Sequence, residues 1–171
     1  MWYLVGRAEE FPAVDARGFP RIHVMVNERA ISIFKTQEGL TAIDSVCAHA
    51  GGDLTHGSIV DVDIEDLSIS AVACPLHRYL YAVAPAQVCG AKVYQSVSFV
   101  HGKPGPTQWK STMKPQSAQR SHRAVEREGH IYLEVSTDEV RYASDASASK
   151  AVCTRAFEFH GSPVAVPDFV L

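Results

Sequence analysis

Short segments of alternating or β-branched residues recur along most of the chain, and this pattern is typical of β-strands. It predicts six strands, at residues 21–26, 30–34, 40–44, 68–73, 79–83 and 130–135. Residues 27–29 separate the first two strands and are predicted to form a hairpin turn. No long segment has helical periodicity, and no internal repeat is evident. Many short strands with turn residues between them predict an all-β, antiparallel sandwich or barrel.

Two segments lack any strand pattern. Residues 101–121 collect glycine, proline and polar residues, which predicts a long loop. Residues 143–150 are small and polar, as in a linker or the ragged edge of a domain. We therefore expect one domain over residues 1–142 and a linker with a C-terminal tail over residues 143–171. The tail is expected to dock on the body because it contains apolar side chains, namely Phe157, Phe159, Val164, Val166 and Phe169.

Composition narrows the class of protein. At 171 residues the chain is long enough to bury a hydrophobic core without help. Its formal net charge of −3 argues against a generally basic nucleic-acid-binding protein. No apolar stretch approaches the length of a membrane span, and the first ten residues lack the pattern of a signal peptide. We therefore expect a monomeric, cytoplasmic protein whose partners are neither nucleic acid nor membranes.

Two short cysteine–histidine pairs carry the strongest chemical signal in the chain. Cys47 is followed by His49, and Cys74 is followed by His77. Each pair places one thiolate and one imidazole on a tight turn, and two such turns can bind a binuclear iron–sulfur cluster. A Cys₂His₂ zinc site is the competing interpretation. It is weaker, because a zinc site has no need of the glycine and proline residues that flank these pairs.

These flanks resemble the two cluster-binding loops of Rieske proteins. Residues 47–57 are similar to the first loop, including its glycines, and residues 74–77 are similar to the second, including its proline. Later segments resemble the eukaryotic soluble Rieske domain-containing proteins, namely residues 77–79, 94–96, 108–110 and 129–133. Over residues 2–145 the chain therefore resembles a soluble Rieske-type ferredoxin.

The chain departs from the family pattern at several positions, none of which is a candidate ligand. The 24 residues between the two pairs exceed the usual bacterial interval, Asp53 replaces a common proline, and Pro85-Ala86 replaces an expected Thr-Gly. Gly52 and Leu76 occupy the positions of the disulfide that bridges the loops of respiratory Rieske proteins. No such bridge is therefore expected.

The resemblance implies a Rieske fold, like that of the respiratory iron–sulfur protein, with a small cluster-binding subdomain of two ligand loops at about residues 45–90. It implies a [2Fe–2S] cluster with Cys47 and Cys74 on one iron and His49 and His77 on the other. It also implies one-electron transfer between a reductase donor and an unidentified acceptor, with no catalytic residues. Such a chain is an electron carrier and not an enzyme.

Three alternative functions stay open at this point. The first is a ferredoxin component or small subunit of a multi-protein oxidoreductase, of the oxygenase or nitrite reductase type. The second is a redox- or iron-sensing binding protein. The third is a zinc-stabilised interaction module.

Other residues give weaker signals. Cys89 and Cys153 are expected to be free thiols, as in most proteins of reducing compartments. The acidic run at residues 61–66 either docks a basic reductase or is a solvated face, and the basic residues within 110–127 are equally ambiguous. Tyr81 is a candidate hydroxyl donor to a cluster sulfur.

Overall fold

Two antiparallel β-sheets make up the protein in the computed structural model, which describes residues 1–149 and 162–171. The larger sheet has the order β12-β1-β11-β10-β4-β3-β2 and contains β1 (Trp2–Arg7), β2 (Arg21–Val26), β3 (Arg29–Thr36), β4 (Gly39–Asp44), β10 (Ser121–Arg127), β11 (His130–Glu134) and β12 (Val164–Val166). The smaller sheet runs in sequence order and contains β5 (Ser58–Ile64), β6 (Leu67–Ala73), β7 (Leu80–Ala84), β8 (Lys92–Val100) and β9 (Lys103–Thr112). The prediction of an all-β antiparallel fold is confirmed.

Helical structure within the described residues is limited to single 3₁₀ turns. They are η1 (Ala8–Glu10), η2 (Leu54–His56), η3 (Ala86–Val88) and η4 (Ala143–Ala146). This agrees with the absence of helical periodicity in the sequence.

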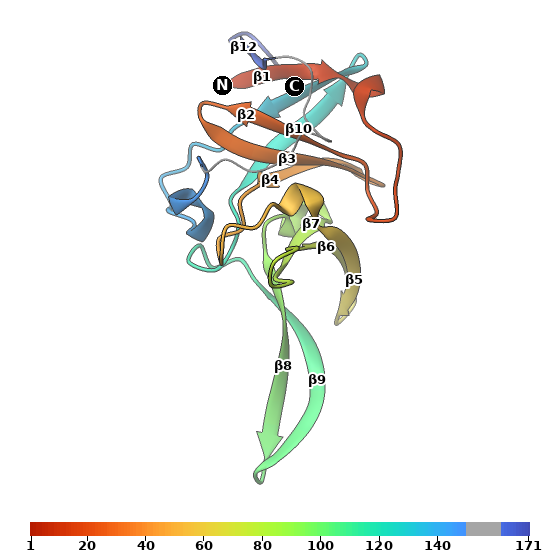
Figure 1. Cartoon of the computed structure of the whole chain (residues 1–171), viewed down its shortest axis with the longest axis vertical. Helices are drawn as coiled ribbons and strands as arrows, with labels where there is room; N and C mark the ends of the chain where they lie inside the picture. Colours follow the sequence, from red (N-terminus) through yellow and green to blue (C-terminus); the bar gives the residue numbers. More distant parts are fainter. Residues whose placement is uncertain (150–161) are drawn as a thin grey trace.

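The smaller sheet is inserted in the chain between two strands of the larger sheet. The chain leaves the larger sheet after β4 and returns at β10, and these two strands pair with each other. Figure 1 shows the larger sheet at one end of the molecule and the smaller sheet below it, with the β8–β9 hairpin of the smaller sheet extending away from the rest of the molecule. The outer strands β5 and β9 also approach each other, so the smaller sheet curls towards a barrel.

All six predicted strands are present, as β2, β3, β4, β6, β7 and β11. The predicted turn between β2 and β3 is also present. Asn27 and Glu28 have φ angles of 50° and 61°, as in the two-residue turns that match the twist of a hairpin. The pattern missed the other strands, which are β1, β5, β8, β9, β10 and β12.

The prediction of a long loop at residues 101–121 is wrong for residues 103–112, whereas residues 113–120 form no strand. Residues 103–112 form β9, which pairs with β8 from Lys92↔Thr112 to Val100↔Lys103. Prolines suit this strand because β9 is at the edge of the sheet, where a missing N–H breaks no hydrogen bond to a further strand. Its polar composition follows from a hairpin that is exposed over most of its length.

Residues 143–149, predicted as a linker, pack against the larger sheet. The fully buried hydroxyl of Ser144 donates a hydrogen bond to the buried carboxylate of Asp44 at the end of β4. Asp44 also accepts hydrogen bonds from Arg29 (2.8 Å) and from His122 Nε2 (3.1 Å). Small side chains at residues 143–149 therefore permit close packing.

The C-terminal residues contact the body through β12 and Phe169. β12 pairs with β1, and the Phe169 ring lies 5.0 Å from the ring of Trp2 and 4.1 Å from that of Tyr132. The predicted apolar contacts of Phe157 and Phe159, and the predicted free thiol of Cys153, fall outside the described residues. The division of the chain at residue 142 stays a prediction.

Asp145 ties η4 to the body, and its loss should destabilise the protein in a pH-dependent way. Hydrogen bonds from Arg120 are the main reason that the pKa of Asp145 falls to about 2. A lowered carboxylate pKa stabilises the fold above pH 4 and stops doing so as pH falls towards 2. Asp145→Asn should cost about 1 kcal/mol at pH 7, allowing for partial exposure, and almost nothing at pH 2. Urea unfolding at pH 7, 4 and 2 measures this difference.

Asp63→Asn is the matched control, because Asp63 is exposed on β5. Its stability should follow that of the wild type at all three pH values. An Asp145→Asn penalty that does not shrink at low pH would contradict the proposed ion pair.

Candidate metal centre

Both ligand loops are closed by backbone hydrogen bonds. Loop 1 covers residues 45–57 between β4 and β5, and loop 2 covers residues 74–79 between β6 and β7. In loop 1 the N–H of Cys47 donates to the carbonyl of Gly52 (2.8 Å). In loop 2 the N–H of Cys74 donates to the carbonyl of Tyr79 (2.8 Å). Each closure brings the cysteine and histidine of one pair into the same turn.

The two cysteines lie together in the protein interior. Cys47 and Cys74 are each 1% exposed and belong to the hydrophobic cluster between the two sheets. Burial raises the pKa of the Cys47 thiol, and the neighbouring Cys74 sulfur raises it further. A thiolate at this place therefore needs a positive charge beside it, such as a metal ion.

The two histidines lie together at the surface. The rings of His49 and His77 are exposed, and their centroids are 4.9 Å apart at an interplanar angle of 83°. Tyr79 stacks on His49 at 3.9 Å, and the Lys92 ammonium lies 4.6 Å from the centroid of the Tyr79 ring. Thiol faces thiol in the interior, and imidazole faces imidazole at the surface.

This pairing bears on the type of metal site. Among residues 1–149 and 162–171, no three His, Cys, Asp or Glu side chains converge to hold one metal ion. The four predicted ligands instead form two like-with-like pairs, which is the donor set of a binuclear cluster with two thiolates on one iron and two imidazoles on the other. The residues present therefore fit the implied [2Fe–2S] group.

Gly52 permits the close approach of the two loops. A Cβ atom added there would lie 2.5 Å from the Cys74 sulfur and 3.2 Å from Cγ of Leu76. Any larger residue would push loop 2 away from loop 1. Gly52, which occupies a disulfide position of the respiratory Rieske proteins, thus lies directly beside the sulfur of a candidate ligand, Cys74.

Tyr81 reaches the sulfur of the other candidate cysteine ligand. Its hydroxyl oxygen lies 3.7 Å from Sγ of Cys47, and the side chain is buried. This is the place expected for a hydroxyl that donates to a thiolate sulfur.

Gln119 holds loop 1 in position, and nothing in the sequence pointed to it. Its fully buried side chain accepts a hydrogen bond from the N–H of Ala48 (2.9 Å). Its amide nitrogen donates to the carbonyls of Asp44 (3.1 Å) and Val46 (3.0 Å). Gln119 is 71 residues from Ala48 along the chain, in a segment that the sequence predicts as a loop, so no local pattern could reveal the contact.

Arg21 anchors the far end of loop 1 and was also missed. It is 2% exposed, and its guanidinium donates hydrogen bonds to the carbonyls of Thr55 (3.4 Å) and Gly57. Burial is the main cause that lowers the pKa of Arg21 to about 10. Loop 1 is therefore held from β2 at one end and from Gln119 at the other.

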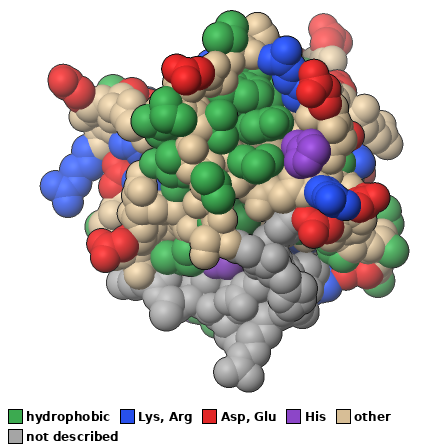
Figure 2. All heavy atoms as spheres, turned by 90° about the horizontal axis from the view of Figure 1, so that it is seen from above, with side chains coloured by type: hydrophobic (Ala, Val, Ile, Leu, Met, Phe, Trp, Pro, Cys, Tyr) green, Lys and Arg blue, Asp and Glu red, His purple; other side chains and the backbone are tan. Residues whose placement is uncertain are grey.

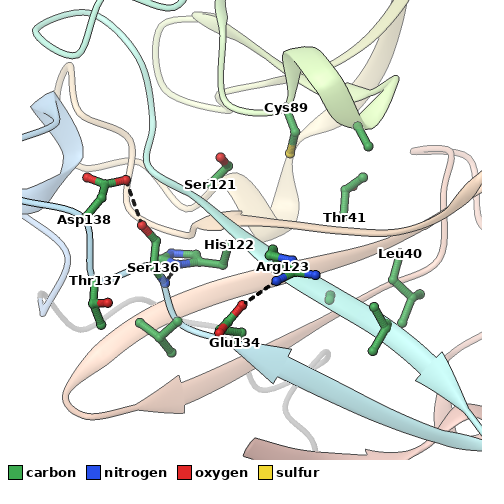
Figure 3. A pocket seen from close by; sticks show the side chains of 14 residues that line it. Leu40, Thr41, Cys89, Ser121, His122, Arg123, Glu134, Ser136, Thr137 and Asp138 are labelled. Atoms are coloured by element: carbon green, nitrogen blue, oxygen red, sulfur yellow. Dashed lines mark hydrogen bonds and ion pairs between the residues drawn. The ribbon is translucent and has the colours of Figure 1, made fainter. Parts of the chain in front are cut away.

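A separate groove of about 550 Å³ lies beside β10 and β11, and none of the four predicted ligands lines it. Figure 3 shows Cys89 and Thr41 on one side of this groove, with the Arg123–Glu134 ion pair below them. Cys89 is a buried free thiol, as predicted, and donates to the carbonyl of Ala42. The groove is thus separate from the two loops that carry the candidate ligands.

Comparison with known proteins identifies the family. The model of the soluble Rieske-type ferredoxin family matches residues 4–138. The chain belongs to this family. A human Rieske domain-containing protein is 28% identical over 135 residues, which cover 79% of this chain and 78% of the human protein. Both findings confirm the resemblance seen in the sequence.

Solved structures support the Rieske fold. NdmB of Pseudomonas putida CBB5 aligns over 80% of this chain with a TM-score of 0.54 at 17% identity, and NdmA of the same bacterium aligns over 80% with a TM-score of 0.51 at 18% identity. At such identity the likeness concerns the fold alone. This chain spans only 35% of NdmB and 34% of NdmA.

Membership of a ferredoxin family associates the chain with electron transfer in general terms. The residues that the structure describes contain no helix that is long and apolar enough to cross a bilayer.

Proposed function

We propose that this soluble Rieske-type ferredoxin is a one-electron carrier that binds a [2Fe–2S] cluster through Cys47, Cys74, His49 and His77. The observation that carries the proposal is the arrangement of two buried thiols beneath two exposed imidazoles. The cluster, when bound, supplies the one-electron chemistry.

Each side chain has a separate task in this proposal. Cys47 and Cys74 would hold the inner iron as thiolates, and the hydrophobic cluster around them shields them from water. His49 and His77 would hold the outer iron, and their exposed rings lie where a partner protein can approach. Tyr81, whose hydroxyl oxygen lies 3.7 Å from Sγ of Cys47, would donate a hydrogen bond to the Cys47 thiolate, and Gly52 lets loop 2 close on loop 1.

The pairing also favours a binuclear cluster over a single zinc ion. A zinc-stabilised module requires four ligands around one ion, whereas the side chains are grouped as two pairs. We propose an electron carrier and not a catalytic enzyme, with a reductase and an acceptor protein as its partners. Monomeric state and cytoplasmic location stay predictions.

Metal analysis tests the proposal directly. Protein purified without added metal should contain about two irons and two acid-labile sulfides per chain and should be coloured. Stoichiometric zinc without sulfide, in a colourless preparation, would overturn it. A sensor with the same cluster would instead be recognised by partner binding that changes between the oxidised and reduced forms.

Tyr81→Phe should lower the reduction potential, because the hydroxyl stabilises the more negative reduced state. Loss of one hydrogen bond of about 1 kcal/mol corresponds to about 43 mV for one electron. Potentiometric titration followed by visible absorption measures the shift. Tyr3→Phe is the control, because the Tyr3 hydroxyl bonds Asn27 on the larger sheet. An unchanged potential in Tyr81→Phe would show that the 3.7 Å contact does not act on the cluster.

A further inference from the structure

Charge is distributed unevenly along the chain. All 19 acidic residues lie outside residues 67–125, a stretch that contains seven of the 16 lysines and arginines. This stretch includes loop 2, β7 and the whole β8–β9 hairpin. The net charge of −3 therefore hides a basic region that adjoins the proposed metal centre.

Most of these cations are not neutralised. Arg120 pairs with Asp138 and Asp145, and Arg123 pairs with Glu134. The other five form no ion pair with any carboxylate within residues 1–149 and 162–171, namely Arg78, Lys92, Lys103, Lys110 and Lys114. Unpaired cations on one region favour an anionic partner.

Strand pairing gathers some of these residues on one face. Lys92 lies opposite Tyr81 and Thr112, and Tyr94 lies opposite Lys110. Directly paired residues project to the same side of a sheet, and so do residues two positions apart. Lys92, Tyr94 and Lys110 therefore share one face of the hairpin, which we call the basic face.

The basic face begins at the proposed ligands. Lys92 lies over Tyr79, and Tyr79 stacks on His49, so ammonium, phenol and imidazole form a continuous column. The opposite face of the hairpin packs inward, because Val93 and Trp109 join the core of the smaller sheet. The basic face thus points away from that core, and Figure 1 shows the hairpin that carries it projecting from the body.

We propose that the basic face is the docking surface for a protein redox partner that presents acidic side chains. The lysines would steer the partner towards His49, and the exposed side chains of Tyr94 (38%) and Leu76 (58%) would supply apolar contact. The proposal rests on the proposed electron-transfer function. Figure 2 shows that the end of the molecule carrying β1 and β12 instead has charged side chains of both signs.

The acidic run at residues 61–66 suits a redox partner less well. Asp61 accepts a hydrogen bond from Ser70 and lines a groove that also includes Lys35. None of the four predicted ligands lines that groove. A partner bound there would not be guided to the imidazoles.

The rate of electron transfer to small charged complexes tests the sign of the electrostatic potential at the proposed metal centre. The reduced protein is mixed with hexacyanoferrate(III), an anion, or with tris(phenanthroline)cobalt(III), a cation, at increasing ionic strength. The net charge of −3 alone predicts that salt accelerates the reaction with the anion. The basic face predicts the reverse, a fall of roughly three- to tenfold between 10 and 100 mM salt.

Charge-neutral variants locate the effect. Lys92→Gln with Lys110→Gln should abolish the salt-dependent fall, and Lys110→Gln alone should weaken it without touching the Tyr79–His49 stack. Arg7→Gln with Lys35→Gln removes the same charge from the larger sheet and should behave as the wild type. A rate with hexacyanoferrate(III) that rises with salt in the cluster-containing wild type would overturn the docking surface. Absence of iron and sulfide would instead overturn the proposed function.

Binding to an immobilised polyanion gives a readout that does not depend on the cluster. The wild type should be retained on poly-L-aspartate resin at low salt despite its net negative charge, and Lys110→Gln should elute earlier. Equal elution of these two proteins would overturn the proposal. The proposal would also be overturned if the wild type bound vesicles of equal parts phosphatidylcholine and phosphatidylserine but was not retained on poly-L-aspartate. That result would assign the hairpin, with its exposed Phe99 and Val100, to a lipid surface.

Discussion

Replacing Cys47 with serine should remove the iron, the acid-labile sulfide and the visible absorption of the purified protein. A serine hydroxyl at this buried place is not deprotonated and is a poor ligand for iron compared with a thiolate. Without the inner iron, the two surface histidines have no second pair of ligands to complete the cluster. Cys74→Ser should behave in the same way, and metal and sulfide assays on the purified variants measure the loss.

Cys89→Ser is a stringent control for this result. Cys89 is 6% exposed and belongs to the same hydrophobic cluster as Cys47 and Cys74, but its Sγ bonds the carbonyl of Ala42. The variant should keep its full content of iron and sulfide. If Cys47→Ser also kept them, the proposed ligand set would be wrong.

Gln119→Leu should destabilise the protein by roughly 3–5 kcal/mol and release the cluster. Leucine has a similar size but cannot replace the three hydrogen bonds to the backbone of residues 44, 46 and 48. Each buried backbone group left without this partner costs about 1–3 kcal/mol. Because Ala48 lies between Cys47 and His49, the displaced loop would carry both ligands with it.

Urea unfolding and iron retention during dialysis measure these two effects. Gln116→Leu is the control, because Gln116 is exposed in the same segment and should change stability by less than about 0.5 kcal/mol. A Gln119→Leu protein with normal stability and normal iron content would show that loop 1 does not depend on this amide.

Local sequence patterns were sufficient for much of the fold. Each of the six predicted strands has apolar alternation or a β-branched run within itself, so a window of a few residues contained the signal. The two cysteine–histidine pairs are equally local, because spacings of two and three residues are set by the turn that holds them. For this reason the candidate ligands could be named before any contact was known.

Contacts between distant segments could not be predicted in this way. The sequence predicts a loop at the place of the hairpin strand β9 because prolines are incompatible with a strand inside a sheet, and only the sheet order shows that β9 is at an edge. Gln119 and Arg21 resemble ordinary polar residues until the fold places them against the backbone of loop 1. Ser144 and Asp145 belong to a segment whose small polar residues also suit a linker.

The sequence by itself determined the chemistry available to this protein: two thiols, two imidazoles and glycines that let the loops approach. Tertiary structure decided how that chemistry is arranged, with the thiols in the interior and the imidazoles at the surface. It also decided that Lys92 and Lys110 share one face of the hairpin and that Lys92 lies over the Tyr79 ring that stacks on His49, since strand pairing brings together residues that the sequence separates. Ligand identity depends on covalent spacing within one turn, whereas burial and charge depend on the packing of the whole chain.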